Sequence, residues 1–176
     1  MSKQVARDEL VTQLRREIRG AQVAVGAVDQ AVAERLEINA TDHRCLDILD
    51  QRGAMTAGGL ADALGLTASA VTTVLDRLEQ RRYVRRATNP DDRRQVLVAL
   101  TPLLRRRARK LYGDGQEVDA VLERYSADEL VLLRDFFRQD RELNEGRAQR
   151  LAASGRTRAT SRRASRKAST VRAADR

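Results

Sequence analysis

The chain has 176 residues and a net charge of +9, from 34 Lys and Arg against 25 Asp and Glu. Hydrophobic residues make up 41% and aromatic residues only 3%, which favours helices packed through Leu, Val and Ala over a β-sandwich or barrel. The single cysteine excludes an intramolecular disulfide framework. We find no signal peptide and no apolar stretch long enough to span a membrane, so we expect a cytoplasmic protein without a membrane partner.

Positive charge is concentrated at the C-terminal end. Residues 154–176 hold eight basic residues and one acidic residue, so they contribute +7 and the first 153 residues only +2. The segment is mostly Arg, Ala, Ser and Thr, with little to bury, which predicts a basic disordered tail. Evidence for nucleic-acid binding by the rest of the chain must therefore come from local clusters.

Apolar residues at steps of three and four predict one long helix over residues 7–36. Its stripe suits either the core or a seam against a partner helix. Thr41 is predicted to cap the next helix, which Gly53 ends. Thr101-Pro102 predicts a later helix toward Tyr112, followed by a short helical segment. A last helix begins at the capping box 126–129.

Two short helices joined through Gly65 predict a helix-turn-helix, with Thr56 and Thr67 as their caps. The second helix has one apolar face, which turns its short hydroxyl residues outward. Such residues let a helix approach the major groove closely and reach phosphates or base edges. An ordinary solvated polar face explains the pattern equally well on spacing alone. The outward residues are Ser69, Thr72, Thr73, Asp76 and Arg77.

A basic β-hairpin follows, with strands predicted over 83–87 and 95–100 around the turn 89–92. An arginine at its tip can enter a narrow minor groove, and an adjacent aspartate can hold that arginine through a charge-assisted hydrogen bond. The alternative is a solvated, salt-bridged surface turn. Six arginines gather within fourteen positions, namely Arg81, Arg82, Arg85, Arg86, Arg93 and Arg94.

The stretch LTASAVTTVLDRLEQRRYVRRATNPDDRRQVLVALTP, residues 66–102, resembles the MarR family of bacterial transcriptional regulators. NATDHRCLDIL, and the capping box followed by Leu130 and Phe136-Phe137, resemble its flanking helices. The resemblance implies a homodimer with intertwined terminal helices and one winged helix-turn-helix per subunit on each half of a pseudopalindromic operator. It also implies release of DNA by a small, often aromatic anionic effector held between the dimer helices and the winged domain.

The predicted architecture is mainly α with a small β wing. A MarR-like domain fills residues 1–153, with a winged helix-turn-helix at about 41–101 and dimerisation helices at about 7–36 and 102–153; residues 154–176 form the tail. The resemblance makes Asp92 and Arg94 the wing pair, with Arg94 in the minor groove. We predict DNA contacts from Thr67, Ser69, Thr72, Thr73, Arg77, Arg86, Asp92, Arg93 and Arg94, and tail contacts from Arg162, Arg163, Arg166 and Lys167.

Two residues depart from the family pattern. Arg82 stands where family members commonly have Gly, at a left-handed backbone position that only Gly occupies cheaply, so we expect strain there or a different helix end. Leu104 also replaces a common Gly.

The function predicted is a sequence-specific DNA-binding regulator, a repressor, with double-stranded DNA, a second copy of the chain and a small-molecule effector as partners. One alternative is an architectural, nucleoid-associated protein that binds DNA non-specifically through the tail. Another is a dimeric scaffold that no longer binds DNA.

The sequence indicates neither an enzyme nor a cofactor. No catalytic triad or phosphate-binding glycine loop is present, since Gly58-Gly59 lacks the flanking residues. His43 is the only histidine, and no recognisable ligand spacing accompanies it, so no metal site is predicted. Cys45 lies on an apolar stripe, which favours core packing over a peroxide-sensing thiol.

Overall fold

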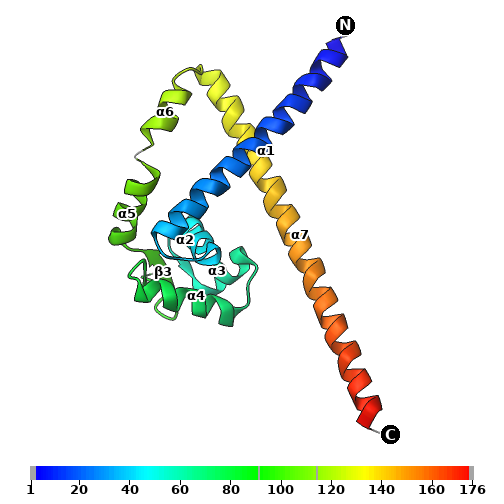
Figure 1. Cartoon of the computed structure of the whole chain (residues 1–176). Helices are drawn as coiled ribbons and strands as arrows, with labels where there is room; N and C mark the ends of the chain where they lie inside the picture. Colours follow the sequence, from blue (N-terminus) through cyan, green and yellow to red (C-terminus); the bar gives the residue numbers. More distant parts are fainter. Residues whose placement is uncertain (1–2, 91, 114, 175–176) are drawn as a thin grey trace. The chain divides into compact units, whose positions relative to one another are not determined.

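The computed structural model describes the backbone of residues 3–90, 92–113 and 115–174 and the side chains of residues 6–90, 92–113 and 115–151 (Figure 1). The chain divides into two compact units, Met1–Asp114 and Gly115–Arg176. The first unit contains α1 (Lys3–Arg35), α2 (Ala40–Arg52), β1 (Met55–Thr56), α3 (Ala57–Leu64), α4 (Ala68–Gln80), β2 (Val84–Thr88), β3 (Val96–Leu100) and α5 (Pro102–Tyr112). The second contains α6 (Gln116–Leu122) and α7 (Ala127–Ala174).

Hydroxyl and amide side chains set where the helices begin. Thr56, Thr67 and Thr101 accept hydrogen bonds from backbone N–H groups in the first turns of α3, α4 and α5, as predicted. The cap predicted for α2 was wrong. Asn39 takes that position, because its Oδ1 accepts from the N–H of Asp42 at 2.9 Å, and Thr41 lies inside the first turn.

The three strands form an antiparallel sheet in the order β1-β3-β2. Both hairpin strands begin one residue later than predicted. Tyr83 still belongs to the turn that follows α4, since its N–H donates to the carbonyl of Leu78, and Gln95 belongs to the hairpin turn, since its N–H donates to the carbonyl of Asp92. The two residues of β1 are too short to give a periodic signal, and the sequence did not predict them.

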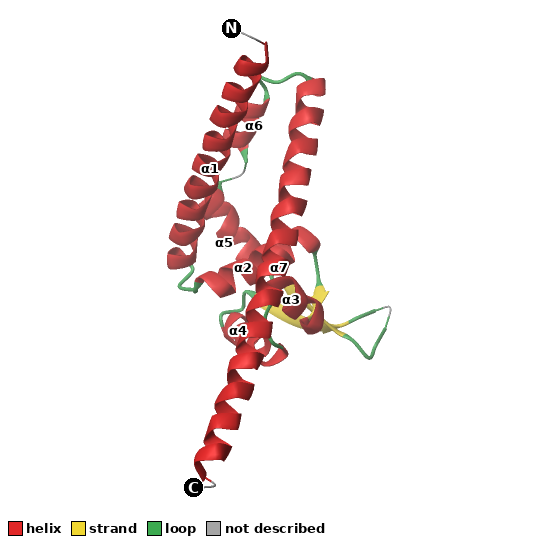
Figure 2. Ribbon diagram, turned by 90° about the vertical axis from the view of Figure 1, so that its right-hand side faces the viewer, coloured by secondary structure: helices red, strands yellow, loops and turns green. Residues whose placement is uncertain are grey.

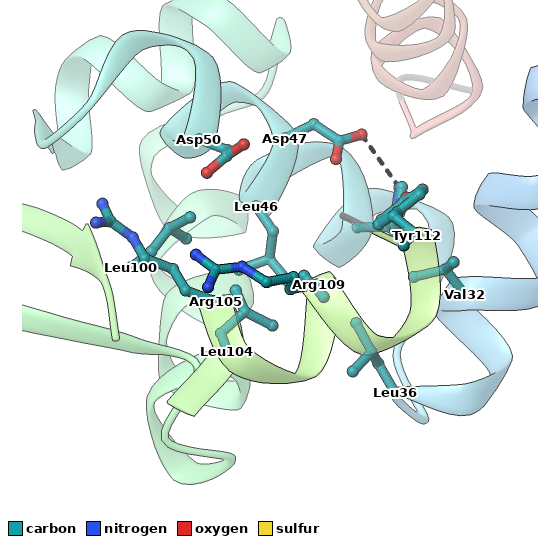
Figure 3. A pocket seen from close by; sticks show the side chains of 13 residues that line it. Val32, Leu36, Leu46, Asp47, Asp50, Leu100, Leu104, Arg105, Arg109 and Tyr112 are labelled. Atoms are coloured by element: carbon teal, nitrogen blue, oxygen red, sulfur yellow. Dashed lines mark hydrogen bonds and ion pairs between the residues drawn. The ribbon is translucent and has the colours of Figure 1, made fainter. Parts of the chain in front are cut away.

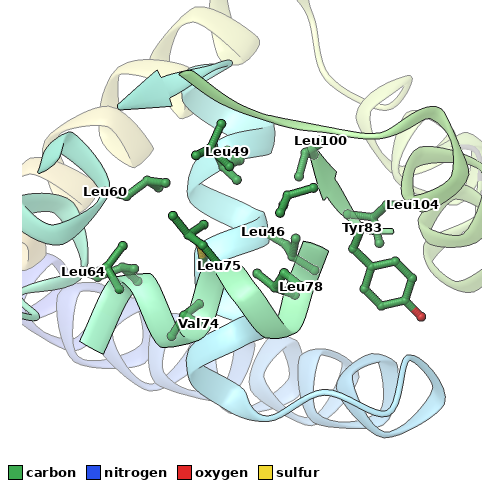
Figure 4. Packing of buried hydrophobic residues seen from close by; sticks show 14 of the residues in the cluster. Leu46, Leu49, Leu60, Leu64, Val74, Leu75, Leu78, Tyr83, Leu100 and Leu104 are labelled. Carbon is green, nitrogen blue, oxygen red and sulfur yellow. The ribbon is translucent and has the colours of Figure 1, made fainter. Parts of the chain in front are cut away.

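One apolar core joins α2, α3, α4 and the sheet (Figure 4). The predicted inner face of α4 is buried through Val71, Val74, Leu75 and Leu78. Cys45 is 0% exposed within this core, which confirms core packing. Burial raises the pKa of its thiol to about 11, the opposite of what a reactive cysteine needs.

Only the C-terminal end of the α1 stripe joins this core. Val32 and Leu36 are each 4% exposed, whereas Leu10 is 64% and Val25 59% exposed. Most of the predicted apolar stripe is therefore exposed and available to pack against another surface. Among the described residues no single helix is long and apolar enough to cross a membrane; α3 and α4 reach that length and composition only as a pair bent by 109°.

The predicted capping box opens α7. The N–H of Ser126 donates to the Glu129 carboxylate at 2.8 Å, and the N–H of Glu129 donates back to the Ser126 hydroxyl at 3.4 Å. The α7 backbone continues to Ala174, where the sequence predicted a disordered tail. Alanine and arginine have high helix propensity, although this stretch offers little apolar surface to pack. The predicted tail contacts Arg162, Arg163, Arg166 and Lys167 lie outside the described side chains.

Candidate nucleic-acid interface

The outer face of α4 presents a row of short hydroxyl side chains. Ser69, Thr72 and Thr73 are exposed, as is the cap residue Thr67. The hydroxyls of Thr72 and Thr73 donate to the carbonyls of Ala68 and Ser69 at 3.0 and 3.1 Å. These bonds use the hydroxyl protons and leave oxygen lone pairs facing outward. The short side chains therefore project little from the helix and can accept hydrogen bonds.

Arg77, predicted to contact DNA, is bound elsewhere. Its Nη2 and Nε donate to the two carboxylate oxygens of Asp42 on α2, at 2.6 and 3.2 Å. Asp42 is 2% exposed, and its hydrogen bond raises the pKa of Arg77. The guanidinium therefore joins α4 to α2.

Arg86 on β2 is bound to α4 in a similar way. It donates to Asp76 at 2.7 Å and also forms an ion pair with Glu79, and the bond to Asp76 raises the pKa of Arg86. This predicted DNA contact thus ties the hairpin to the outer side of α4.

The hairpin of β2, β3 and the loop between them, called the wing below, projects away from the helices (Figure 2). Arg93 and Arg94 are exposed beside its tip. Asp92 does contact Arg94, but through the backbone: its Oδ1 accepts from the Arg94 N–H at 3.0 Å and its Oδ2 accepts from the Gln95 side chain at 3.1 Å. Asp92 thus shapes the turn that carries Arg94.

The predicted left-handed position after α4 is confirmed. Arg82 has a φ of +59°, its N–H donates to the carbonyl of Glu79, and the next N–H donates to Leu78. At the left-handed position of this helix-ending pattern, Gly has the lowest conformational energy.

Comparison with known proteins places this chain in a family. A sequence profile of the MarR family matches residues 38–96. The HTH-type transcriptional regulator YcgE of Bacillus subtilis is 35% identical over 123 residues, which cover 69% of this chain and 80% of YcgE. The chain belongs to the MarR family. It is therefore a transcriptional regulator, and the predicted resemblance is confirmed.

Solved structures of other proteins share the fold. RV1404 from Mycobacterium tuberculosis is 26% identical, with a TM-score of 0.52 over 80% of this chain and 95% of that one. NadR, solved in complex with 4-hydroxyphenylacetate, is 20% identical, with a TM-score of 0.52 over 72% of this chain and 90% of NadR. The mainly α architecture with a small β wing is confirmed.

In this member of the MarR family, a cavity of about 620 Å³ lies between α1, α2, the end of β3 and α5 (Figure 3). Apolar side chains form much of its wall. Arg105 and Arg109 of α5, and Asp47 and Asp50 of α2, add charges of both signs. The apolar residues are Val32, Leu36, Leu46, Leu100, Leu104 and Ala108.

A hydrogen-bonded network includes three residues of the cavity wall, His43, Asp47 and Tyr112. His43 Nε2 lies 2.7 Å from the Tyr112 hydroxyl, which donates to Asp29 at 3.1 Å, and His43 Nδ1 lies 3.2 Å from Asp47. Burial, and then Asp29, raise the pKa of Tyr112. Burial also raises the pKa of Asp47, with His43 acting against it.

The sequence did not predict this network, because its members come from three helices and lie up to 83 positions apart. Ligand-type atoms of Asp29, His43 and Asp47 lie within 4.8 Å of one another, a grouping with no signal in the residue spacing. Tyr112 and Asp47 already engage both ring nitrogens of His43. The group therefore joins α1, α2 and α5 through hydrogen bonds.

Proposed function

We propose that this chain binds a pseudopalindromic operator as a homodimer in the cytoplasm and represses transcription by occupying the promoter. The observation that best supports this proposal is that Arg86 holds the wing, with its exposed arginines, against α4 and its exposed hydroxyl face. A helix with short hydroxyl side chains on its outer face can enter a major groove, and an exposed arginine such as Arg94 can enter the adjacent minor groove. Two copies would place their reading helices about one helical turn apart.

The homodimer is supported by the exposed part of α1. Leu10, Leu14 and Val28 are 64%, 51% and 49% exposed along a stripe of near-heptad spacing. Such a stripe is stabilised when a second helix covers it. The second unit has exposed apolar residues as well, including Leu132 and Phe137 at 70% and 62%. A second copy is the simplest source of a covering surface.

The regulator is tested by selecting bound duplexes from a random pool with the full chain and with a chain ending at residue 153. We expect one short inverted repeat from both. Even recovery of all sequences would instead support the architectural protein that compacts DNA through its tail.

The wing assignment is tested with Arg94→Ala. We expect about tenfold or more weaker binding to the selected duplex at moderate salt, with an unchanged dimer in sedimentation. Arg106→Ala, which removes an exposed arginine of α5, serves as the matched control. Unchanged affinity of Arg94→Ala for the selected duplex would overturn the minor-groove assignment, whereas failure of the unaltered chain to bind any duplex would favour the scaffold that does not bind DNA.

An effector is the second part of the proposal. The cavity has an apolar wall and two arginines, which suits a small aromatic anion, and NadR, a neighbour in fold, was solved with 4-hydroxyphenylacetate. Occupancy would shift the dimer between two geometries that differ in the spacing of the reading helices. Titrating 4-hydroxyphenylacetate should raise the melting temperature and weaken DNA binding, and Arg109→Gln should reduce both effects.

A further inference from the structure

Two neighbouring residues of α4 are tied to different elements. Arg77 binds Asp42 on α2 through both of its carboxylate oxygens, at 2.6 and 3.2 Å. Asp76, the preceding residue, binds Arg86 on β2 at 2.7 Å. Consecutive residues point about 100° apart around a helix. The two ion pairs therefore hold α4 from two directions, between them fixing its rotation about its own axis.

The Asp42 side of this arrangement is the better fixed. Its carboxylate is buried, with 3% of the side chain exposed, against 51% for Asp76. Its backbone N–H donates to the Asn39 cap at 2.9 Å, so the residue is set in the first turn of α2. A bidentate arginine–carboxylate pair constrains both the distance and the plane of the guanidinium. Asp42 can thus transmit the position of α2 to α4.

We propose that Asp42 is a positioning residue for DNA reading, which acts by holding Arg77 and so aims the hydroxyl face of α4. Arg77 then contributes to specificity without contacting DNA. The proposal deepens the operator binding proposed above and rests on it. It replaces the sequence-based prediction that Arg77 touches the duplex.

Removing the charge of Asp42 distinguishes a positioning role of Arg77 from a direct contact with phosphate, because the two roles predict opposite changes in operator affinity. Asp42→Asn removes a negative charge near the interface, and by electrostatics alone this tightens binding to any duplex. It would also release Arg77 to reach phosphate, if that were its role. Under the positioning role, Asp42→Asn weakens binding to the selected operator by about tenfold, while binding to a scrambled duplex of the same length stays equal or tightens. Asp62→Asn, with the same charge change at an exposed residue of α3, is the matched control.

Arg77→Lys provides the second arm, since it keeps the charge and loses the planar fork. We expect it to lower the ratio of operator to scrambled affinity about as much as Asp42→Asn does, with the salt slope unchanged. By contrast, replacing an arginine that contacts a phosphate by Gln lowers the slope of log affinity against log salt by about one. The double variant Asp42→Asn/Arg77→Gln carries no unpaired buried charge, and its loss should equal that of either single variant instead of their sum.

Each result decides the proposal. Equal losses in the single and double variants, with α4 amides exchanging faster by hydrogen exchange, support it. An operator affinity of Asp42→Asn that matches Asp62→Asn, or a lowered salt slope in Arg77→Gln, overturns it. Should the unaltered chain bind all duplexes alike, the proposed operator binding fails; amide exchange of α4 in Asp42→Asn then decides the positioning contact by itself, and unchanged exchange rejects it.

Discussion

Thr101 joins the turn that follows α4 to the start of α5. Its hydroxyl donates to the carbonyl of Arg82 at 2.6 Å and accepts from the N–H of Leu104 at 3.2 Å. Arg82 has a φ of +59°, so the carbonyl that Thr101 binds belongs to a strained residue. One side chain thus caps a helix and stabilises the left-handed turn from which the wing begins.

Replacing Arg82 by glycine should stabilise the fold. A residue with a Cβ carries a cost of about 1 kcal/mol in the left-handed region that glycine does not. We therefore expect Arg82→Gly to raise the unfolding free energy by about 1 kcal/mol in urea denaturation. Arg81→Gly is the control, because Arg81 has a φ of −78° and glycine there should be destabilising. Destabilisation by Arg82→Gly would mean that the arginine side chain makes a contact worth more than its strain.

Removing the Thr101 hydroxyl should weaken both connections. Thr101→Ala loses an N-cap and a hydrogen bond to a carbonyl, and we expect a loss of about 1–2 kcal/mol in unfolding free energy. Thr101→Ser keeps the hydroxyl and should lose much less. The same urea denaturation compares the two variants, and equal losses would assign the effect to the methyl group instead.

Cys45 should make the fold sensitive to alkaline pH. Its pKa is raised by burial from an ordinary value of 9.0 to about 11, so the unfolded chain ionises first as the pH rises. The stabilising contribution is thus fully present below pH 9 and is lost between about 9 and 11. By pH 10.5 the loss amounts to about 2 kcal/mol. Comparing the unfolding free energies of the unaltered chain and Cys45→Ala at pH 8 and 10.5 isolates this contribution, and an unchanged difference would contradict it.

How far the sequence predicted the molecule depends on the distance between the interacting residues. The inner face of α4, the caps Thr56, Thr67 and Thr101, and the capping box all follow from neighbours within four positions. Asn39 was missed because Thr41, nearby, offers an equally good capping oxygen. These local signals were enough to place the helix-turn-helix and the wing.

The partners of the site residues were beyond such signals. Asp42 meets Arg77 across 35 positions, and His43 meets Tyr112 across 69. An outward position on a helical wheel describes where Arg77 leaves the helix, and a long side chain can still turn back to a neighbouring helix. Only the packing of α2 against α4 decides that, and spacing along one helix holds no information about it.

The tail prediction follows from charge alone. Deleting residues 154–176 removes +7 from the chain, so fewer counterions are released when DNA binds. We expect the deletion to lower affinity for the selected and scrambled duplexes by the same factor and to flatten the dependence of log affinity on log salt. A full-length variant with its eight basic tail residues replaced by glutamine separates charge from chain length and should behave like the deletion. A loss of affinity confined to the operator duplex would instead mean that the tail recognises sequence. The repetitive Arg, Ala and Ser composition provides no side-chain pattern for such recognition.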